Sequence, residues 1–124
     1  MHEMSLAGGV LSLVEQAAVR EGFKRVNCLR LEVGKLSGVE IESMRFALQA
    51  LAPGTCLEGA RIEIDEPPGQ AWCLICSKLI SIKERGDACG HCGGYQLQAT
   101  GGTELRVVDL LVDDDDGQEI ERCA

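Results

Sequence analysis

Residues 73–92 read CLICSKLISIKERGDACGHC, in which two Cys-x₂-Cys pairs are separated by twelve residues. Each pair can form a tight turn that presents two sulfur atoms to one point, and two such turns complete a tetrahedral shell around one zinc ion. The gap is slightly shorter than is usual for such sites, but a short hairpin can span it. We therefore predict a zinc site whose ligands are Cys73, Cys76, Cys89 and Cys92.

Glycines stand beside the second cysteine pair, where tight turns favour them. Gly90, Gly93 and Gly94 can take a positive φ and let backbone N–H groups approach the sulfur atoms. The alternatives for this pattern are a redox-active Cys-x-x-Cys pair and a disulfide, but the spacing favours a metal. Because protein side chains would fill all four positions, we predict a structural site with no open position for water or substrate.

The composition narrows the class of protein. The chain has 124 residues, of which 45% are hydrophobic, so it is long enough for one or two small lobes with a modest core. A formal net charge of −8 disfavours nonspecific binding to nucleic acid. Residues 1–16 contain no lysine or arginine, and no apolar run is long enough to span a membrane. We expect a cytoplasmic protein, in which free thiols persist and paired cysteines usually bind metal.

The residues before the cysteine pairs predict a small α/β lobe. Between residues 4 and 22, apolar side chains recur at helical spacing, and Gly22 supplies a stop. Residues 25–33 and 60–65 alternate between apolar and polar side chains, as half-buried strands do. Between these strands, Ser37-Gly38-Val39-Glu40 has the form of a capping box, and a helical apolar face follows it until Pro53.

Proline and glycine clusters indicate that the cysteine pairs lie on an insertion. Pro67-Pro68-Gly69 and Gly101-Gly102 flank the segment, and residues 79–82 supply material for a hairpin. After it, residues 105–112 form a nearly continuous apolar run, which suits a strand buried on both faces. We expect this strand to join the sheet that the chain began before the insertion.

The predicted fold class is α+β, with a small mixed sheet, two helices and an inserted zinc-ribbon-like domain with four cysteine ligands. We assign residues 1–68 and 103–113 to an α/β domain and residues 69–102 to the zinc-binding domain. Residues 114–124 form an acidic tail, which we expect to be disordered because runs of like charge are usually solvated.

The start of the chain, Met1-His2-Glu3, is the second chemically informative place. The α-amine, the amide nitrogen of His2 and the His2 imidazole can close two fused chelate rings around one ion, and the Glu3 amide or carboxylate can complete a plane. Such a nitrogen-rich, square-planar set suits Ni(II) or Cu(II) better than zinc. Taken alone, however, the pattern fits an exposed histidine at a frayed terminus better than a metal ligand.

The two motifs together are more specific than either one. A chain of this length that begins Met1-His2-Glu3-Met4-Ser5, continues into an α/β lobe and carries the two cysteine pairs resembles the hydrogenase nickel-incorporation proteins of the HypA family, also called HybF. The resemblance covers essentially the whole chain. It implies a nickel metallochaperone for the maturation of [NiFe]-hydrogenase, and not an enzyme.

The resemblance also implies partners and a role for each site. The chain would act with a HypB-type GTPase and deliver Ni(II) to the hydrogenase large subunit, and association into a homodimer is left open. His2 and the backbone of Met1, His2 and Glu3 would bind nickel weakly enough to pass it on, and Glu3 would influence nickel handling and partner binding. The α/β domain would thus be the nickel-binding domain, and the four cysteines would hold structural zinc.

Two other classes of protein fit parts of the pattern. A thiol oxidoreductase would need an exposed thiolate and no bound metal. A zinc-ribbon module for nucleic-acid or protein binding needs a basic or aromatic face, yet the segment between Gly69 and Gly102 has only three basic side chains against two acidic ones. The side chains available for such a face are Trp72, Lys78, Lys83, Arg85 and Tyr95.

The remaining histidine and cysteines have weaker interpretations. Some HypA family members carry histidines next to their zinc cysteines, and here only His91, within the second pair, is so placed. We interpret His91 as a solvent-facing residue at the tip of the turn, with a contact to zinc or nickel as the alternative. Cys28 and Cys56 are interpreted as small core residues, and Cys123 as a free thiol in the tail.

Overall fold

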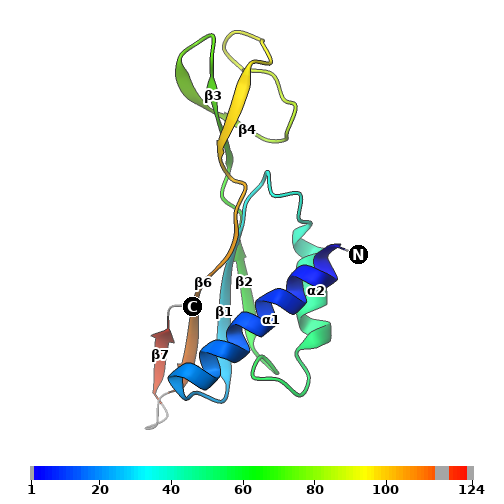
Figure 1. Ribbon diagram of the computed structural model, residues 1–124, viewed down its shortest axis with the longest axis vertical. Coiled ribbons are helices and arrows are strands. Elements are labelled where there is room, and N and C mark those ends of the chain that lie inside the picture. Colours follow the sequence, from blue (N-terminus) through cyan, green and yellow to red (C-terminus); the bar gives the residue numbers. More distant parts are fainter. Residues whose placement is uncertain (1, 114–117, 123–124) are drawn as a thin grey trace. The chain divides into compact units, whose positions relative to one another are not determined.

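The computed structural model describes residues 2–113 and 118–122, which form two helices and seven strands (Figure 1). A four-stranded sheet has the strand order β2-β1-β6-β7, and a three-stranded sheet has the order β4-β3-β5. This arrangement confirms the predicted α+β class with two helices and a separate ribbon-like sheet. The elements are α1 (His2–Glu21), β1 (Val26–Val33), α2 (Ile41–Leu51), β2 (Arg61–Asp65), β3 (Gly69–Cys73), β4 (Lys78–Ile82), β5 (Leu97–Gly101), β6 (Leu105–Asp113) and β7 (Glu119–Arg122).

The chain divides into two compact units. Unit 1 consists of Met1–Leu31, Glu40–Ile64 and Val107–Ala124, and unit 2 consists of Glu32–Val39 and Asp65–Arg106. Unit 1 contains both helices, and unit 2 contains both cysteine pairs. No helix among the described residues is long and apolar enough to cross a membrane.

Helix α1 forms where the apolar spacing predicts a helix. It buries the face made by Ala7, Val10, Val14, Ala17 and Ala18. The helix begins at His2, before the first residue of the predicted apolar pattern, and Glu3 in its first turn is favourable there because a helix N-terminus carries partial positive charge. At the other end Gly22 has φ 79°, and its N–H donates to the carbonyl of Ala18 at 2.9 Å, so the predicted glycine stop is confirmed.

The start of α2 differs from the predicted capping box, in which Ser37 would be the N-cap. The N-cap is Glu40, whose carboxylate accepts hydrogen bonds from the backbone N–H groups of Glu42 and Ser43. The Ser37 hydroxyl instead accepts the N–H of Val39 at 3.2 Å. Gly38 has φ 78°, a left-handed conformation that a right-handed helix cannot include, so α2 begins only after it.

The core of unit 1 lies between the two helices and the four-stranded sheet, since both helices lie on one face of that sheet (Figure 1). The strand β6 lies between β1 and β7, which confirms that the chain returns to its first sheet after the cysteine pairs. The prediction that this strand is buried on both faces is wrong. Leu110 and Val112 are buried, but Leu111 is only half-buried, because the helices cover a single face of the sheet. Cys28 and Cys56 are buried, as predicted.

The sequence predicted that residues 114–124 are disordered, but part of this tail forms a strand. Residues Glu119–Arg122 form β7, which pairs antiparallel with Leu110–Asp113 of β6. Ile120 alternates with charged neighbours, so this short segment has the pattern of an edge strand. The rest of the predicted tail, residues 114–117 and 123–124, including Cys123, lies outside the described residues.

In unit 2, β3 is the central strand and pairs antiparallel with β4 and with β5. The segment before α2 joins this unit through backbone hydrogen bonds: Gly34 N–H donates to the Glu104 carbonyl at 2.7 Å, and Leu36 N–H donates to the Gly102 carbonyl at 2.6 Å. The two backbone segments approach so closely that a Cβ at Gly34 would lie 2.1 Å from the Gly102 oxygen. Glycine is therefore required at position 34 for this contact.

Candidate metal centres

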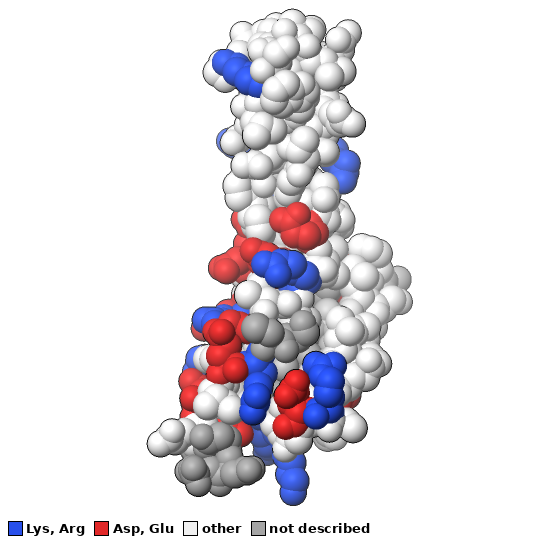
Figure 2. All heavy atoms as spheres, turned by 60° about the vertical axis from the view of Figure 1, so that its left-hand side comes forward, with Lys and Arg blue, Asp and Glu red and all other residues white. Residues whose placement is uncertain are grey.

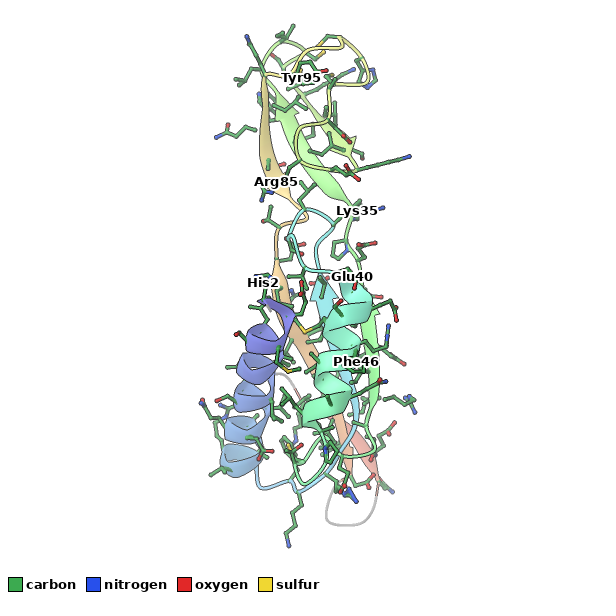
Figure 3. All side chains as sticks on the ribbon, turned by 90° about the vertical axis from the view of Figure 1, so that its right-hand side faces the viewer. His2, Lys35, Glu40, Phe46, Arg85 and Tyr95 are labelled. Atoms are coloured by element: carbon green, nitrogen blue, oxygen red, sulfur yellow. The ribbon has the colours of Figure 1, made fainter. Side chains whose placement is uncertain are left out.

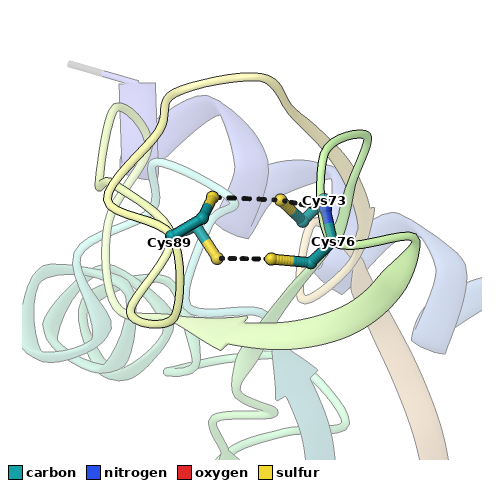
Figure 4. A group of neighbouring side chains, drawn as sticks. Cys73, Cys76 and Cys89 are labelled. Carbon is teal, nitrogen blue, oxygen red and sulfur yellow. Dashed lines mark hydrogen bonds between the residues drawn. The ribbon is translucent and has the colours of Figure 1, made fainter.

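The four predicted zinc ligands converge in unit 2 (Figure 4), where their sulfur atoms lie within 4.8 Å of one another. Cys73 Sγ lies 3.7 Å from Cys92 Sγ, and Cys76 Sγ lies 3.9 Å from Cys89 Sγ. A tetrahedral site with Zn–S bonds of ~2.3 Å places its sulfur atoms about 3.8 Å apart. A disulfide would need about 2.05 Å, so the geometry fits one metal ion and is compatible with structural zinc.

Two equivalent turns present the sulfur atoms. Cys73 ends β3 and pairs with Lys78 of β4, so the first cysteine pair lies in the turn between these strands. The second pair lies between β4 and β5. In the first turn Ser77 N–H donates to the Cys73 carbonyl at 2.8 Å, and in the second Gly93 N–H donates to the Cys89 carbonyl, also at 2.8 Å. Ser77 and Gly93 both have positive φ, 54° and 72°, so each turn closes through a left-handed residue.

Backbone N–H groups point at two of the sulfur atoms, although neither donor is one of the predicted glycines. Cys76 N–H donates to Cys73 Sγ, and His91 N–H donates to Cys89 Sγ, each at 3.4 Å. Such hydrogen bonds stabilise the negative charge of a thiolate. The side chain of His91 is exposed, so the backbone of this residue is the part that faces the sulfur.

The predicted role of the glycines is right at one position and wrong at two. Gly93 takes a positive φ, but Gly90 and Gly94 do not. Gly94 is instead needed for space, because a Cβ there would lie 3.2 Å from Ile75 Cδ1 and 3.4 Å from Cys92 Sγ. The sequence shows which residues are glycine, whereas their separate reasons depend on how the two turns pack.

Cys76 and Cys89 differ in the pKa of their thiols. Backbone N–H groups of Cys92 and His91 lower the pKa of Cys89 to about 6. Burial, together with hydrogen bonding among the neighbouring thiols, raises the pKa of Cys76 to about 12. Without a cation the cluster therefore cannot hold four negative charges near neutral pH. A divalent metal ion would remove this conflict, because it attracts each thiolate and offsets the repulsion between them.

Two of the four cysteines belong to a small buried cluster. Cys73 and Cys89 are buried together with Ala71 and Ile80, whereas Cys92 is exposed. Half of this small cluster thus consists of candidate metal ligands. A metal ion bound here would connect the β3–β4 turn to the following loop in a place where few apolar side chains do so.

The N-terminal candidates lie at the start of α1 in unit 1. His2 Nδ1 lies 3.5 Å from Glu3 Oε2, and the same carboxylate oxygen accepts the backbone N–H of Glu40 at 3.3 Å. In Figure 3, His2 and Glu40 lie at the same end of the two helices. The hydrogen bond from Glu40, above all, lowers the pKa of Glu3 below its usual value. Glu3 therefore joins the first turn of α1 to the N-cap of α2, a role that the sequence did not reveal.

The first turn of α1 leaves donor atoms available for a metal ion. The His2 side chain is 60% exposed. The first four N–H groups of an α-helix have no carbonyl partner within the helix, so the amides of His2 and Glu3 are not needed for the helical hydrogen bonds. The structure brings the imidazole and the Glu3 carboxylate together, while Met1 and its α-amine lie outside the described residues.

Comparison with known proteins places this arrangement in a family. The family model described as "Hydrogenase/urease nickel incorporation, metallochaperone, hypA" matches residues 1–112. The protein named "Hydrogenase maturation factor HypA" from Polaromonas naphthalenivorans is 64% identical over 115 residues, which are 93% of this chain and 100% of that protein. The protein of the same name from Cupriavidus necator is 65% identical over 114 residues, 92% of this chain and 96% of that one.

Solved structures share the fold at much lower sequence identity. The solution structure of the Ni metallochaperone HypA from Helicobacter pylori has a TM-score of 0.63 at 18% identity, and the alignment covers 89% of this chain and 96% of that chain. Another solution structure of a HypA protein has a TM-score of 0.65 at 19% identity, and covers 90% of this chain and 96% of that chain. These two structures support the arrangement of helices and sheets.

Proposed function

The chain belongs to the HypA family of nickel-incorporation metallochaperones for hydrogenase maturation, and we propose that it binds Ni(II) at its N-terminus for delivery to the large subunit of a [NiFe]-hydrogenase. A HypB-type GTPase would act with it in this delivery. The observation that carries the proposal is the family match over residues 1–112, which includes His2, Glu3 and all four paired cysteines. In this proposal the protein works in the cytoplasm and catalyses no reaction.

The nickel site proposed here uses His2 Nδ1 and the backbone nitrogens of Met1, His2 and Glu3. These nitrogen donors suit a square-planar Ni(II) ion. Binding of the imidazole to nickel would end its contact with Glu3, and the Glu3 carboxylate would then keep only its hydrogen bond from Glu40. Glu3 would thereby hold the first turn of α1 in place while the histidine binds or releases the ion.

Structural zinc is the proposed occupant of the four-cysteine cluster. Zinc held by such a site contributes roughly 10–16 kcal/mol of folding-coupled binding energy, which suits a permanent part of the protein. The N-terminal site offers one exposed imidazole and backbone nitrogens in place of four thiolates, so its ion can leave more readily. The two sites thus have different roles: one ion stabilises unit 2, and the other is cargo.

The test is titration of Ni(II) into untagged protein by isothermal calorimetry, because a polyhistidine tag would bind nickel itself. We expect the wild type to bind one Ni(II) with about micromolar affinity, and His2→Ala to lose that site. The matched control is His91→Ala, since His2 and His91 are the two histidines of the chain. His91→Ala should bind nickel like the wild type.

Metal analysis of the same samples completes the experiment. One zinc per chain in all three proteins, together with loss of nickel in His2→Ala alone, supports both site assignments. Equal nickel affinity in the wild type and His2→Ala would reject the N-terminal site. Loss of nickel in His91→Ala instead would move the cargo site to unit 2.

A further inference from the structure

The strand β5 is an outer strand of the sheet in unit 2. Its neighbour on one side is β3, and no described strand lies on its other side. Leu74 N–H donates to the Gln96 carbonyl at 3.0 Å, which shows the backbone groups of Gln96 facing β3. Because facing and outward residues alternate in an antiparallel pair, the backbone of Gln98 also faces β3, whereas the backbones of Leu97 and Ala99 face away from it.

Some of these outward-facing backbone groups have no protein partner. The N–H of Leu97 donates to the Tyr95 carbonyl at 2.9 Å. The carbonyl of Leu97 and both backbone groups of Ala99 have no hydrogen-bond partner among the described residues. Ala99 is also exposed. Such a row of open donors and acceptors can hold another extended chain through main-chain hydrogen bonds.

The edge formed by β5 lacks the charges that protect the other edges. The edge strand β2 exposes Arg61, Glu63 and Asp65, β7 also alternates charged side chains, and β4 begins with Lys78. Charged or proline residues on an edge strand oppose strand addition. Residues 88–103, which include β5, contain no Asp, Glu, Lys, Arg or Pro. In Figure 2, charged side chains lie over much of unit 1, whereas the visible face of unit 2 is largely uncharged.

A cavity of about 270 Å³ lies beside this edge, within unit 2. Leu97 and Ala99 of β5 line it together with Tyr95, and the segment after β4 contributes Arg85 and Asp87. In Figure 3, Tyr95 and Arg85 lie towards opposite ends of the three-stranded sheet. Successive side chains of a strand point to opposite faces, so every second side chain of a chain added to β5 would lie on the face that holds the cavity.

The charges in the cavity favour an acidic side chain. The carboxylate of Asp87 accepts the backbone N–H groups of Lys83 and Glu84, at 3.0 and 3.1 Å, so its own turn already uses it. Arg85 Nε donates to the Leu36 carbonyl at 3.1 Å, but its guanidinium forms no ion pair with a carboxylate of the described residues. Each of the other arginines has such an ion pair, namely Arg20, Arg25, Arg30, Arg45, Arg61, Arg106 and Arg122.

We propose that the outer edge of β5 binds an extended segment of a partner protein, which adds to the sheet as a strand and presents an acidic side chain to Arg85. The main-chain hydrogen bonds would use the N–H and carbonyl of Ala99 and the carbonyl of Leu97. The carboxylate would pair with the guanidinium that lacks one within the described chain. This surface lies in unit 2 and does not depend on the nickel site, so every test below is made without nickel.

The first experiment titrates a probe peptide into the full, zinc-loaded chain and follows the backbone amides by nitrogen–proton correlation NMR. The peptide is acetyl-Thr-Val-Thr-Glu-Thr-Val-Thr-amide, which as a strand presents its glutamate and both valines on one face. The matched peptide has glutamine in place of glutamate. We expect a saturable shift of the Ala99 amide, because this N–H gains an acceptor, and at least about fivefold tighter binding of the glutamate peptide.

Two protein variants test the role of Arg85. Arg85→Gln should bind both peptides with the same affinity, since the partner of the carboxylate is gone. Lys83→Gln is the matched control, because it makes the same change of charge in the same segment but Lys83 does not line the cavity. Lys83→Gln should therefore keep the preference for the glutamate peptide.

Two further variants test the main-chain hydrogen bonds. Ala99→Pro removes an N–H that faces away from β3, so the pairing of β3 with β5 is kept while both peptides bind about fivefold more weakly or less. Ala99→Ser keeps the N–H and should bind like the wild type. The zinc content shows whether each variant is folded. If Ala99→Pro is not, Arg85→Gln and Lys83→Gln decide the question, since neither position lies in a strand.

Four outcomes would overturn the proposal. The first is the absence of any saturable shift at about 1 mM peptide. The second is a set of shifts centred outside β5, and the third is a preference for the glutamate peptide that Arg85→Gln retains. The fourth is a shift of the Ala99 amide that depends on protein concentration without peptide, because the occupant would then be a second copy of this chain.

Discussion

The two units of the molecule bury different kinds of side chain. Unit 1 has an apolar core to which both helices and the sheet contribute, including Val14, Leu29, Leu48 and Leu110. Around the cysteine pairs of unit 2, the buried cluster consists of Ala71, Cys73, Ile80 and Cys89. A lobe with so few buried apolar groups needs another source of stability, and a metal ion can provide it. We therefore expect hydrophobic packing to stabilise unit 1 and a bound metal ion to stabilise unit 2.

Each unit carries its own spectroscopic reporter. The single tryptophan of the chain, Trp72, lies on β3 in unit 2 and is 37% exposed. Both described helices lie in unit 1, so circular dichroism at helical wavelengths reports mainly on that unit. Unfolding of one unit can therefore be followed separately from unfolding of the other.

The largest expected effect is that of removing the metal from unit 2. Cys73→Ala, or a strong chelator, should unfold this unit, because a bound structural zinc accounts for roughly 10–16 kcal/mol of folding-coupled energy. Tryptophan fluorescence should change to that of an exposed indole, while helical circular dichroism is retained. Equal loss of both signals would contradict the separate stabilisation of the two units. Cys28→Ala is the control, since this buried thiol lies outside the sulfur cluster.

An intermediate effect is expected from a change in the other unit, namely a cavity in the apolar core of unit 1. Leu48 lies on α2 and is fully buried, so Leu48→Ala should lower the free energy of unfolding of this unit by about 2–5 kcal/mol. Urea titration followed by circular dichroism measures the change. The zinc content should stay at one per chain. Loss of zinc from Leu48→Ala would show that unit 2 depends on the packing of unit 1.

The smallest expected effect concerns the two equivalent cysteine turns. Ser77 has φ 54°, which costs a residue with a Cβ more than it costs glycine, so Ser77→Gly should raise the zinc affinity by less than about fivefold. Gly93→Ser is the matched exchange in the other turn, where φ is 72°, and it should lower the affinity by a similar factor. Competition with a chromophoric chelator measures both. A higher zinc affinity in Gly93→Ser would show that the two turns are not equivalent.

The comparison between units also explains how far the sequence could predict the fold. The elements of unit 1 follow from local patterns, such as the apolar face of α1 and the alternation in β1, because each depends on residues close together in the chain. The N-cap of α2 was misplaced because Ser37 and Glu40 have the spacing of a capping box, whereas the left-handed conformation of Gly38 keeps the helix from beginning before Glu40.

The sequence by itself determined the family and the set of four cysteines. Their spacing is a local property, because each Cys-x₂-Cys pair forms one tight turn that presents two sulfur atoms to the same point. Only the tertiary structure decided that the Glu3 carboxylate accepts a hydrogen bond from Glu40. It also decided that residues Glu119–Arg122 form β7, since Asn27 and Arg30, which bind this strand, are distant from it in the chain. An acidic tail by itself predicts solvation, and a part of it forms a strand only when the rest of the fold supplies an open edge and partners for its carboxylates.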